Sequence, residues 1–97
     1  MIHCGVMPSQ AEQLKERTKR FAIRVVKMFR VPPKTEEARV SGKQVLRSGT
    51  SVAANYRAVC RARSKAEFIA KIGVVVEEID ETVFWLELLV ETEDRPR

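Results

Sequence analysis

The chain has 97 residues, of which 44% are hydrophobic and 32% are charged, and its formal net charge is +5. This composition is too hydrophobic for a disordered protein, and no run reaches the roughly 18 uncharged apolar residues that a transmembrane helix needs. We expect a single domain over residues 9–92, between a frayed tail at 1–8 and a C-terminal tail at 93–97, with no membrane partner.

The N-terminal residues show no basic leader followed by an apolar block, so we expect no signal peptide and a cytoplasmic protein. Cysteines stay reduced in that compartment. Cys4 falls in the tail. Cys60 falls inside an expected helix, where a buried, inert thiol is a better interpretation than a disulfide or a nucleophile.

The first helix is expected over about residues 10–30, because Ser9 and Glu12 have the spacing of a capping box. Mostly apolar residues then recur at steps of four and three, at Leu14, Thr18, Phe21, Val25 and Met28. Pro32 and Pro33 cannot continue a helix. The short connection predicts that the next helix packs antiparallel to the first.

The second helix is expected over about residues 35–61, with Thr35 as its cap. Its heptad positions keep the same register, at Ala38, Gly42, Val45, Gly49, Val52, Tyr56 and Val59. Several of them are small, which indicates close approach of another backbone, and Gly49 is where any kink is expected. We interpret residues 48–51, Ser-Gly-Thr-Ser, as tight packing or a helix break rather than an anion site, because their spacing is not that of a phosphate-binding loop.

The third helix is expected over about residues 64–91, after a second capping box at Ser64 and Glu67. Its main apolar row lies at Phe68, Ile72, Val75, Ile79, Thr82, Leu86 and Leu89. A parallel row follows one position later, at Ile69, Val76, Val83 and Val90. A helix of roughly 27 residues is about 40 Å long, which predicts an elongated bundle.

The last three turns of this helix are apolar on almost every side. Two other helices cannot cover such a surface completely, so we expect self-association. The expected interface residues are Phe84, Trp85, Leu88 and Leu89. The alternative is a core helix of a monomer that leaves some apolar residues exposed.

Charge divides along the chain. Residues 11–65 hold 15 Lys and Arg against 4 Asp and Glu, whereas residues 66–94 hold 1 against 9. The basic residues fall in rows that could neutralise the phosphates of a nucleic acid, namely Arg17, Arg20, Arg24, Lys27, Arg39, Lys43, Arg47, Arg57, Arg61 and Arg63. Two alternatives are that these rows are merely solvated, or that they pair with the acidic cluster at Glu77, Glu78, Asp80 and Glu81.

Catalysis is not expected. The single histidine, His3, lies in the tail, and there are no Glu-x-x-His pairs of the kind that hold two iron ions in a bundle. We expect neither a metal site nor a cofactor.

Four segments together resemble the four helix bundle protein family, whose founding members are encoded by intervening sequences in bacterial 23S rRNA genes. These segments are Leu14 with residues 17–25 (RTKRFAIRV), residues 47–57 (RSGTSVAANYR), residues 64–71 (SKAEFIAK), and Glu77 to Thr82 with Trp85 and Leu86. The resemblance runs from about Leu14 to Val90.

The resemblance implies an all-α, antiparallel up-down bundle that assembles into a homopentamer and has no known enzymatic activity. Similar proteins include the accessory variability determinant of diversity-generating retroelements, a basic pentamer that binds nucleic acid and a reverse transcriptase. Family members usually continue into a fourth helix, and we expect this sequence to form three long helices without it.

The sequence therefore predicts a non-enzymatic, self-associating bundle of three long helices with basic faces for RNA or DNA. The alternative is an oligomeric scaffold that binds another protein and no nucleic acid.

Overall fold

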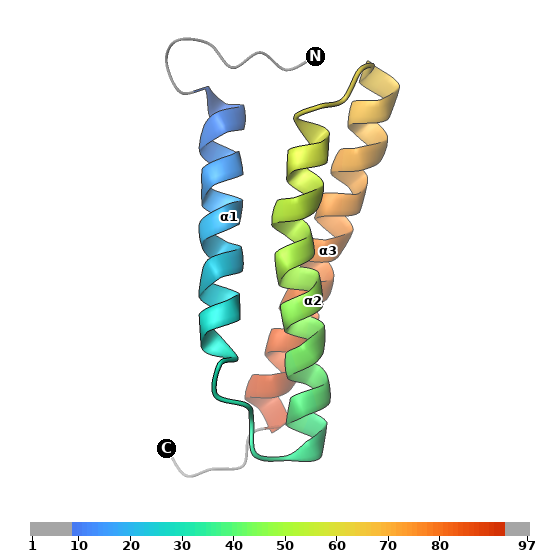
Figure 1. Ribbon diagram of the computed structural model, residues 1–97. Coiled ribbons are helices and arrows are strands. Elements are labelled where there is room, and N and C mark those ends of the chain that lie inside the picture. Colours follow the sequence, from blue (N-terminus) through green and yellow to red (C-terminus); the bar gives the residue numbers. More distant parts are fainter. Residues whose placement is uncertain (1–8, 93–97) are drawn as a thin grey trace.

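The computed structural model describes residues 9–92, and all of its regular structure is helical (Figure 1). Helix α1 spans Gln10–Met28, α2 spans Glu36–Val59 and α3 spans Lys65–Thr92. The predicted all-α bundle of three long helices is confirmed. Helices α1 and α2 each end two residues before the expected position, and α3 extends one residue further.

Each helix begins at a side-chain cap that the sequence indicated. Ser9 Oγ accepts a hydrogen bond from the Glu12 N–H at 3.1 Å, and Thr35 Oγ1 accepts one from the Ala38 N–H at 3.2 Å. Ser64 Oγ does the same for the Glu67 N–H at 3.0 Å. These bonds satisfy N–H groups that have no partner within the helix, which is why the starts of the helices could be located closely.

Helix α2 is the middle element of the bundle. Helices α1 and α3 both run antiparallel to it, and therefore in the same direction as each other (Figure 1). Both pack on α2, whereas no Cα atom of α1 lies within 8 Å of a Cα atom of α3. The result is an open arrangement rather than a closed bundle, with extents of 49 × 26 × 18 Å, so the predicted elongation is confirmed.

Two glycines bring α1 close to α2. A Cβ atom at Gly49 would lie 3.2 Å from a methyl carbon of Val25, and one at Gly42 would lie 2.8 Å from the ring of Phe29. The small residues are thus explained by close approach, although side chains of α1 rather than its backbone fill the space. Helix α2 is assigned as one helix through Gly49.

The contact between α2 and α3 holds the largest apolar cluster. It is formed by Val52, Tyr56, Val59 and Val75, with Cys60, Phe68 and Ile72 packed around it. Cys60 is half-buried, with a free thiol. The predicted apolar register of α2 is confirmed, because six of its seven positions are buried and Ala38 is half-buried.

The apolar rows of α1 and α3 are buried less than the sequence predicted. Leu14, Phe21 and Met28 are 44%, 37% and 56% exposed. Val25 is the residue of α1 that is buried on α2, against Gly49, and Phe21 reaches the same glycine with one edge of its ring. On α3, Ile79 is 45% exposed, and the parallel row that follows the contact positions is exposed throughout. Neither helix has a neighbour on that side among the described residues.

Over residues 9–92, the structure contains no helix with the length and apolar character needed to span a membrane.

Candidate nucleic-acid and self-association surfaces

All ten basic residues that the sequence analysis singled out are exposed. Four belong to α1, five belong to α2 or directly follow its end, and Arg63 lies in the connection to α3. The structure does not merge them into one patch. The basic row on α1 does not face α2. Its four members are exposed, whereas Val25 is buried against Gly49 of α2.

The α1 row is mostly free of counter-charges. Arg20 forms an ion pair of 3.4 Å with Glu16 one turn away on the same helix. Arg17, Arg24 and Lys27 form no ion pair with any residue in the range 9–92. These guanidinium and ammonium groups are available to an anionic partner.

The α2 row follows the same pattern. Arg39 approaches Glu36 at 3.8 Å, and with Lys43 it lines a shallow apolar depression beside Phe29, Pro32 and Pro33. Lys43, Arg57, Arg61 and Arg63 have no ion-pair partner within the described part of the chain.

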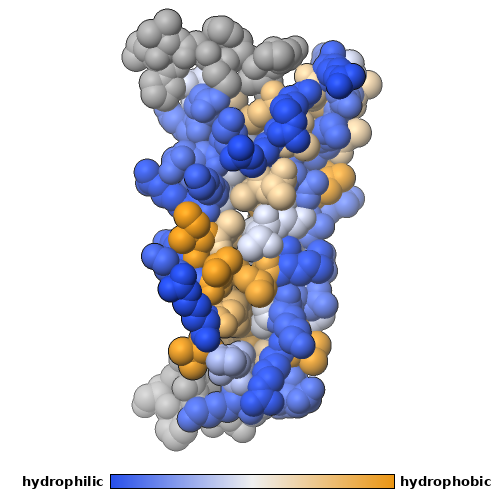
Figure 2. Space-filling view, in the orientation of Figure 1, coloured by the Kyte–Doolittle hydropathy of each residue, from blue (hydrophilic) through white to orange (hydrophobic). Residues whose placement is uncertain are grey.

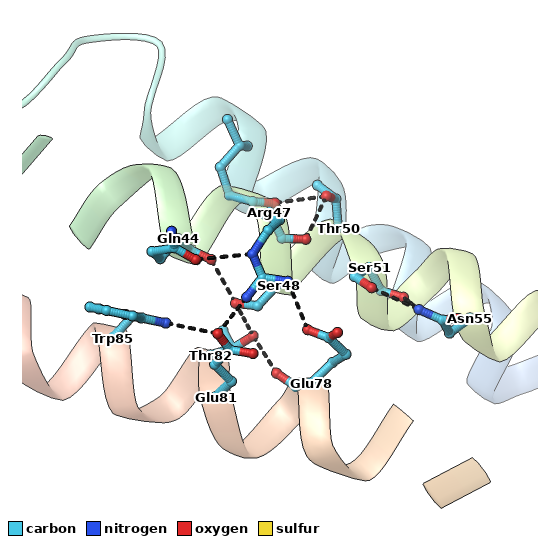
Figure 3. A network of polar contacts seen from close by, with 11 residues as sticks. Gln44, Arg47, Ser48, Thr50, Ser51, Asn55, Glu78, Glu81, Thr82 and Trp85 are labelled. Carbon is cyan, nitrogen blue, oxygen red and sulfur yellow. Dashed lines mark hydrogen bonds and ion pairs between the residues drawn. The ribbon is translucent and has the colours of Figure 1, made fainter. Parts of the chain in front are cut away.

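Arg47 differs from the other nine, because it bridges α2 and α3. Its guanidinium donates to Glu78 at 3.3 Å and to Glu81 at 2.5 Å, and also to Gln44 on its own helix (Figure 3). The Trp85 indole N–H donates to the same Glu81 carboxylate at 3.2 Å. Arg47 is thus engaged by acidic side chains that a phosphate would have to displace.

These contacts act on the acid–base behaviour of the pair. The hydrogen bond from Arg47, and secondly the one from Trp85, hold the pKa of Glu81 below its ordinary value. The Glu81 carboxylate in turn raises the pKa of Arg47. Both groups are exposed to solvent, so salt weakens their attraction.

A buried hydroxyl pair lies beside this ion pair. Thr82 and Ser48 are 2% and 0% exposed, and their oxygens are 2.7 Å apart across α2 and α3. Ser48 donates to the Gln44 carbonyl, while the Thr82 hydroxyl proton is shared between Ser48 Oγ and the Glu78 carbonyl (Figure 3). Thr50 donates to the Leu46 and Arg47 carbonyls, and Ser51 Oγ accepts from Asn55 Nδ2. The hydroxyl groups of residues 48–51 are therefore engaged by neighbouring helix residues, as the tight-packing interpretation expects.

The four residues expected at a self-association interface fall into two groups. Phe84 is 52% exposed, whereas Trp85, Leu88 and Leu89 are half-buried. The rings of Phe84 and Trp85 meet edge to face with centroids 5.0 Å apart. Of these four side chains, Phe84 is therefore the one with the most surface open to a partner.

Other exposed apolar side chains lie outside that segment. Figure 2 shows apolar residues along the middle of the face that α1 and α2 form, between hydrophilic margins. Exposed apolar residues of these two helices include Ile23, Val26 and Leu46. Over residues 9–92, no group of three or more acidic, histidine or cysteine side chains is placed to hold a metal ion.

For Arg47, the structure matches the alternative that the basic rows pair with the acidic cluster, here at Glu78 and Glu81. Sequence reasoning did not single out Arg47 for this role, and it did not find the pairing of Ser48 with Thr82. The sequence does contain an arginine in the predicted second helix and acidic residues about one turn apart in the third. It also has polar residues, Ser48 and Thr82, at or beside apolar positions of these two helices. Only the register of α2 against α3 makes them partners.

Comparison with known proteins identifies a family. A protein from Bacteroides thetaiotaomicron, described as a protein of unknown function from the S23 ribosomal protein family, has a similar solved structure. Its TM-score is 0.80 at 38% identity, over 92% of this chain and 80% of that one. Among curated proteins, none matches this chain.

The model of the family called 23S rRNA-intervening sequence protein matches residues 11–94. Neither this match nor the solved structure indicates an enzymatic family. The match covers all three helices and the basic rows on α1 and α2, so the resemblance noted from the sequence is confirmed: the chain belongs to the 23S rRNA-intervening sequence protein family.

Proposed function

We propose that this protein is a non-enzymatic, self-associating helical bundle that binds RNA through the basic rows of α1 and α2. The observation that supports RNA binding is the location of the counter-charges. Of the ten basic residues, Arg47 alone forms an ion pair with α3 among residues 9–92. The acidic residues of α3 therefore leave nine of these ten positive charges without an ion pair to that helix.

The spacing of the rows suits a phosphate backbone better than bases. Cations at one-turn intervals neutralise successive phosphates without reading sequence. Two aromatic residues lie near the second row. Tyr56 is 7% exposed within the core, and Phe29, which lines the depression with Arg39 and Lys43, is half-buried against Gly42, so neither offers an open ring for base stacking. We expect binding that depends on charge and shape and little on sequence.

Self-association is supported by apolar exposure. Each of the three helices leaves large apolar side chains more than a third exposed, including Phe21, Leu46 and Val76. A monomer with apolar residues exposed over so many positions would be prone to association.

The experiment that tests RNA binding is a salt titration of affinity for a fluorescently labelled, structured RNA. The test variant is Lys43→Glu/Arg57→Glu/Arg61→Glu, because these side chains are exposed and form no ion pair with a described residue. We expect the affinity of the wild-type protein to fall steeply with salt. In a plot of the logarithm of the binding constant against the logarithm of the salt concentration, loss of three phosphate contacts should reduce the magnitude of the slope by about 2.

The matched control is Arg30→Glu/Lys34→Glu/Lys65→Glu, which changes the net charge equally at exposed positions outside the rows. It should retain most of the affinity. An equal loss in both triple variants would mean that only net charge matters, and unchanged binding in the test variant would favour a scaffold whose partner is a protein.

A further inference from the structure

The first of two outward surfaces that carry the inference is the shallow apolar depression between the end of α1 and the first half of α2. Leu46 borders it, and Phe29, Pro32 and Pro33 line it. Its volume is about 220 Å³. Small-molecule sites measure roughly 300 to 1,000 Å³, so this space suits a single large side chain better than a metabolite. We call it the α1–α2 depression.

The second surface is the outer side of α3 around Phe84. Phe84 is 52% exposed, and the edge-to-face contact with Trp85 supports its ring from one side. Asp80 and Glu87 lie about one turn before and after it, and both are exposed. Neither carboxylate forms an ion pair with a residue in the range 9–92. This surface is therefore an exposed aromatic side chain between two acidic ones.

The two surfaces lie on opposite sides of the bundle. The hydrogen bond between Ser48 and Thr82 marks where α2 and α3 meet. Leu46 comes two residues before Ser48 and Phe84 two residues after Thr82, and two residues turn a helix by about 200°. Leu46 therefore faces away from α3, and Phe84 faces away from α2. Within one chain they cannot meet.

The two surfaces match in height along the bundle. Because α2 and α3 run antiparallel, equal steps back from Ser48 and forward from Thr82 lead to the same level (Figure 1). Steps of two, five and nine residues give three pairs, namely Leu46 with Phe84, Lys43 with Glu87, and Arg39 with Glu91. The first pair is apolar on both sides, and each of the other two sets a cation level with a carboxylate.

The charged members of these pairs are available to a partner. Lys43, Glu87 and Glu91 form no ion pair with a described residue. Arg39 approaches only Glu36 on its own helix, at 3.8 Å and exposed to solvent. Ion pairs beside a contact that excludes water are stronger than those on an open surface.

We propose that Phe84 of one copy of this chain occupies the α1–α2 depression of the next copy, with Glu87 against Lys43 and Glu91 against Arg39. A rotation axis parallel to the helices leaves every height unchanged, so it brings all three pairs together at once. A two-fold axis across the helices would reverse the heights and separate the pairs. Because the contact joins two different surfaces, each copy offers both, and rotation about the parallel axis closes the contacts into a ring.

This contact rests on the self-association proposed above and names its residues. It is compatible with the homopentamer that the family resemblance implies, since the heights do not depend on the number of copies in the ring. It assigns Arg39 and Lys43 to the neighbouring copy. The α1 row, together with Arg57, Arg61 and Arg63, is left for RNA.

Solution mass by light scattering, at several protein concentrations, tests the contact. The wild-type protein should form an assembly of several 11.1 kDa chains. Phe84→Glu should have the mass of one chain, because a carboxylate would have to enter an apolar space. Val74→Glu is the matched control and should keep the assembly, since Val74 is also exposed, at 41%, but lies about 15 Å from Phe84 along α3.

Complementation between two variants tests whether the contact joins unlike surfaces. Leu46→Glu should also be a monomer, because it alters the depression. In an equimolar mixture, Phe84 of the Leu46→Glu chain can still enter the depression of the Phe84→Glu chain. The mixture should therefore form a complex of two chains, which would also show that both variants are folded.

Charge exchange tests the height match. Glu87→Lys and Lys43→Glu should each shift the mass toward the monomer, because each sets like charges against one another. The double variant Glu87→Lys/Lys43→Glu should restore the assembly.

Each contrary result identifies which proposal fails. A monomeric wild-type protein would contradict self-association itself. An assembly that survives Phe84→Glu or Leu46→Glu, or a mixture that stays monomeric, would retain self-association and overturn this contact. If Leu46→Glu kept its mass but lost RNA affinity, the depression would belong to the RNA site instead. RNA binding is measured separately with Arg17→Glu/Arg24→Glu on α1, outside this contact, so it can hold or fail alone.

Discussion

At the scale of single residues, the position of Arg47 separates two uses of a basic side chain. Arg47 and Arg57 are both exposed arginines of α2, yet the first is held by Glu78 and Glu81 and the second has no ion pair with a described residue. The spacing of basic residues along the sequence places both arginines in the same row of α2 and does not distinguish them. The difference arises because the α3 carboxylates lie within reach of only one of them.

This contact predicts a pH dependence. Because the folded state lowers the pKa of Glu81, the interaction contributes its full stability above the unfolded pKa of about 4.3 and loses it as the pH falls through the folded value. The stability difference between the wild-type protein and Arg47→Met should therefore be present at neutral pH and shrink in acid. Urea denaturation at several pH values measures it.

Arg57→Met is the control for that measurement, since Arg57 has no ion pair with a residue in the described range. Its difference from the wild-type protein should not change with pH. A difference for Arg47→Met that stayed constant below pH 4 would show that the Glu81 carboxylate does not contribute through its charge.

At the scale of the helices, glycine has a different role in each element. Gly42 lies where Phe29, the residue after α1, packs on α2, whereas the space around Gly73 on α3 is open, with no described atom within 4 Å of an added Cβ. The same residue type thus permits close packing in one helix and only weakens the other.

We predict opposite effects of the same substitution. Gly42→Ala should destabilise the protein by about 1 kcal/mol net, because its methyl would lie 2.8 Å from the Phe29 ring and overpacking exceeds the gain in helix propensity. Gly73→Ala should stabilise it by up to about 1 kcal/mol. Chemical denaturation of both variants against the wild-type protein measures the two changes, and equal signs would contradict this account of the α1–α2 contact.

At the scale of the whole molecule, stability should depend on association. No Cα atom of α1 lies within 8 Å of one of α3, and each helix leaves large apolar side chains exposed, so association of chains would bury apolar area. Binding that favours the folded state stabilises it by mass action. The melting temperature of the wild-type protein should therefore rise with protein concentration.

Circular dichroism melts over a hundredfold range of concentration measure this effect. A variant that is monomeric in solution should melt at a temperature independent of concentration. A wild-type melting temperature that did not move would show that folding is complete within one chain.

The sequence by itself determined the number, order and starts of the helices, because caps, prolines and apolar periodicity act between neighbouring residues. It also determined the family and the division of charge between basic α1 and α2 and acidic α3. The tertiary structure decided which apolar rows are buried and which cation is neutralised. Periodicity places Phe21 and Val25 on adjoining lines of one helix, but only the position of α2 determines that Val25 is buried and Phe21 remains exposed. The physical reason is that burial and ion pairing depend on distances between helices, which local sequence patterns do not contain.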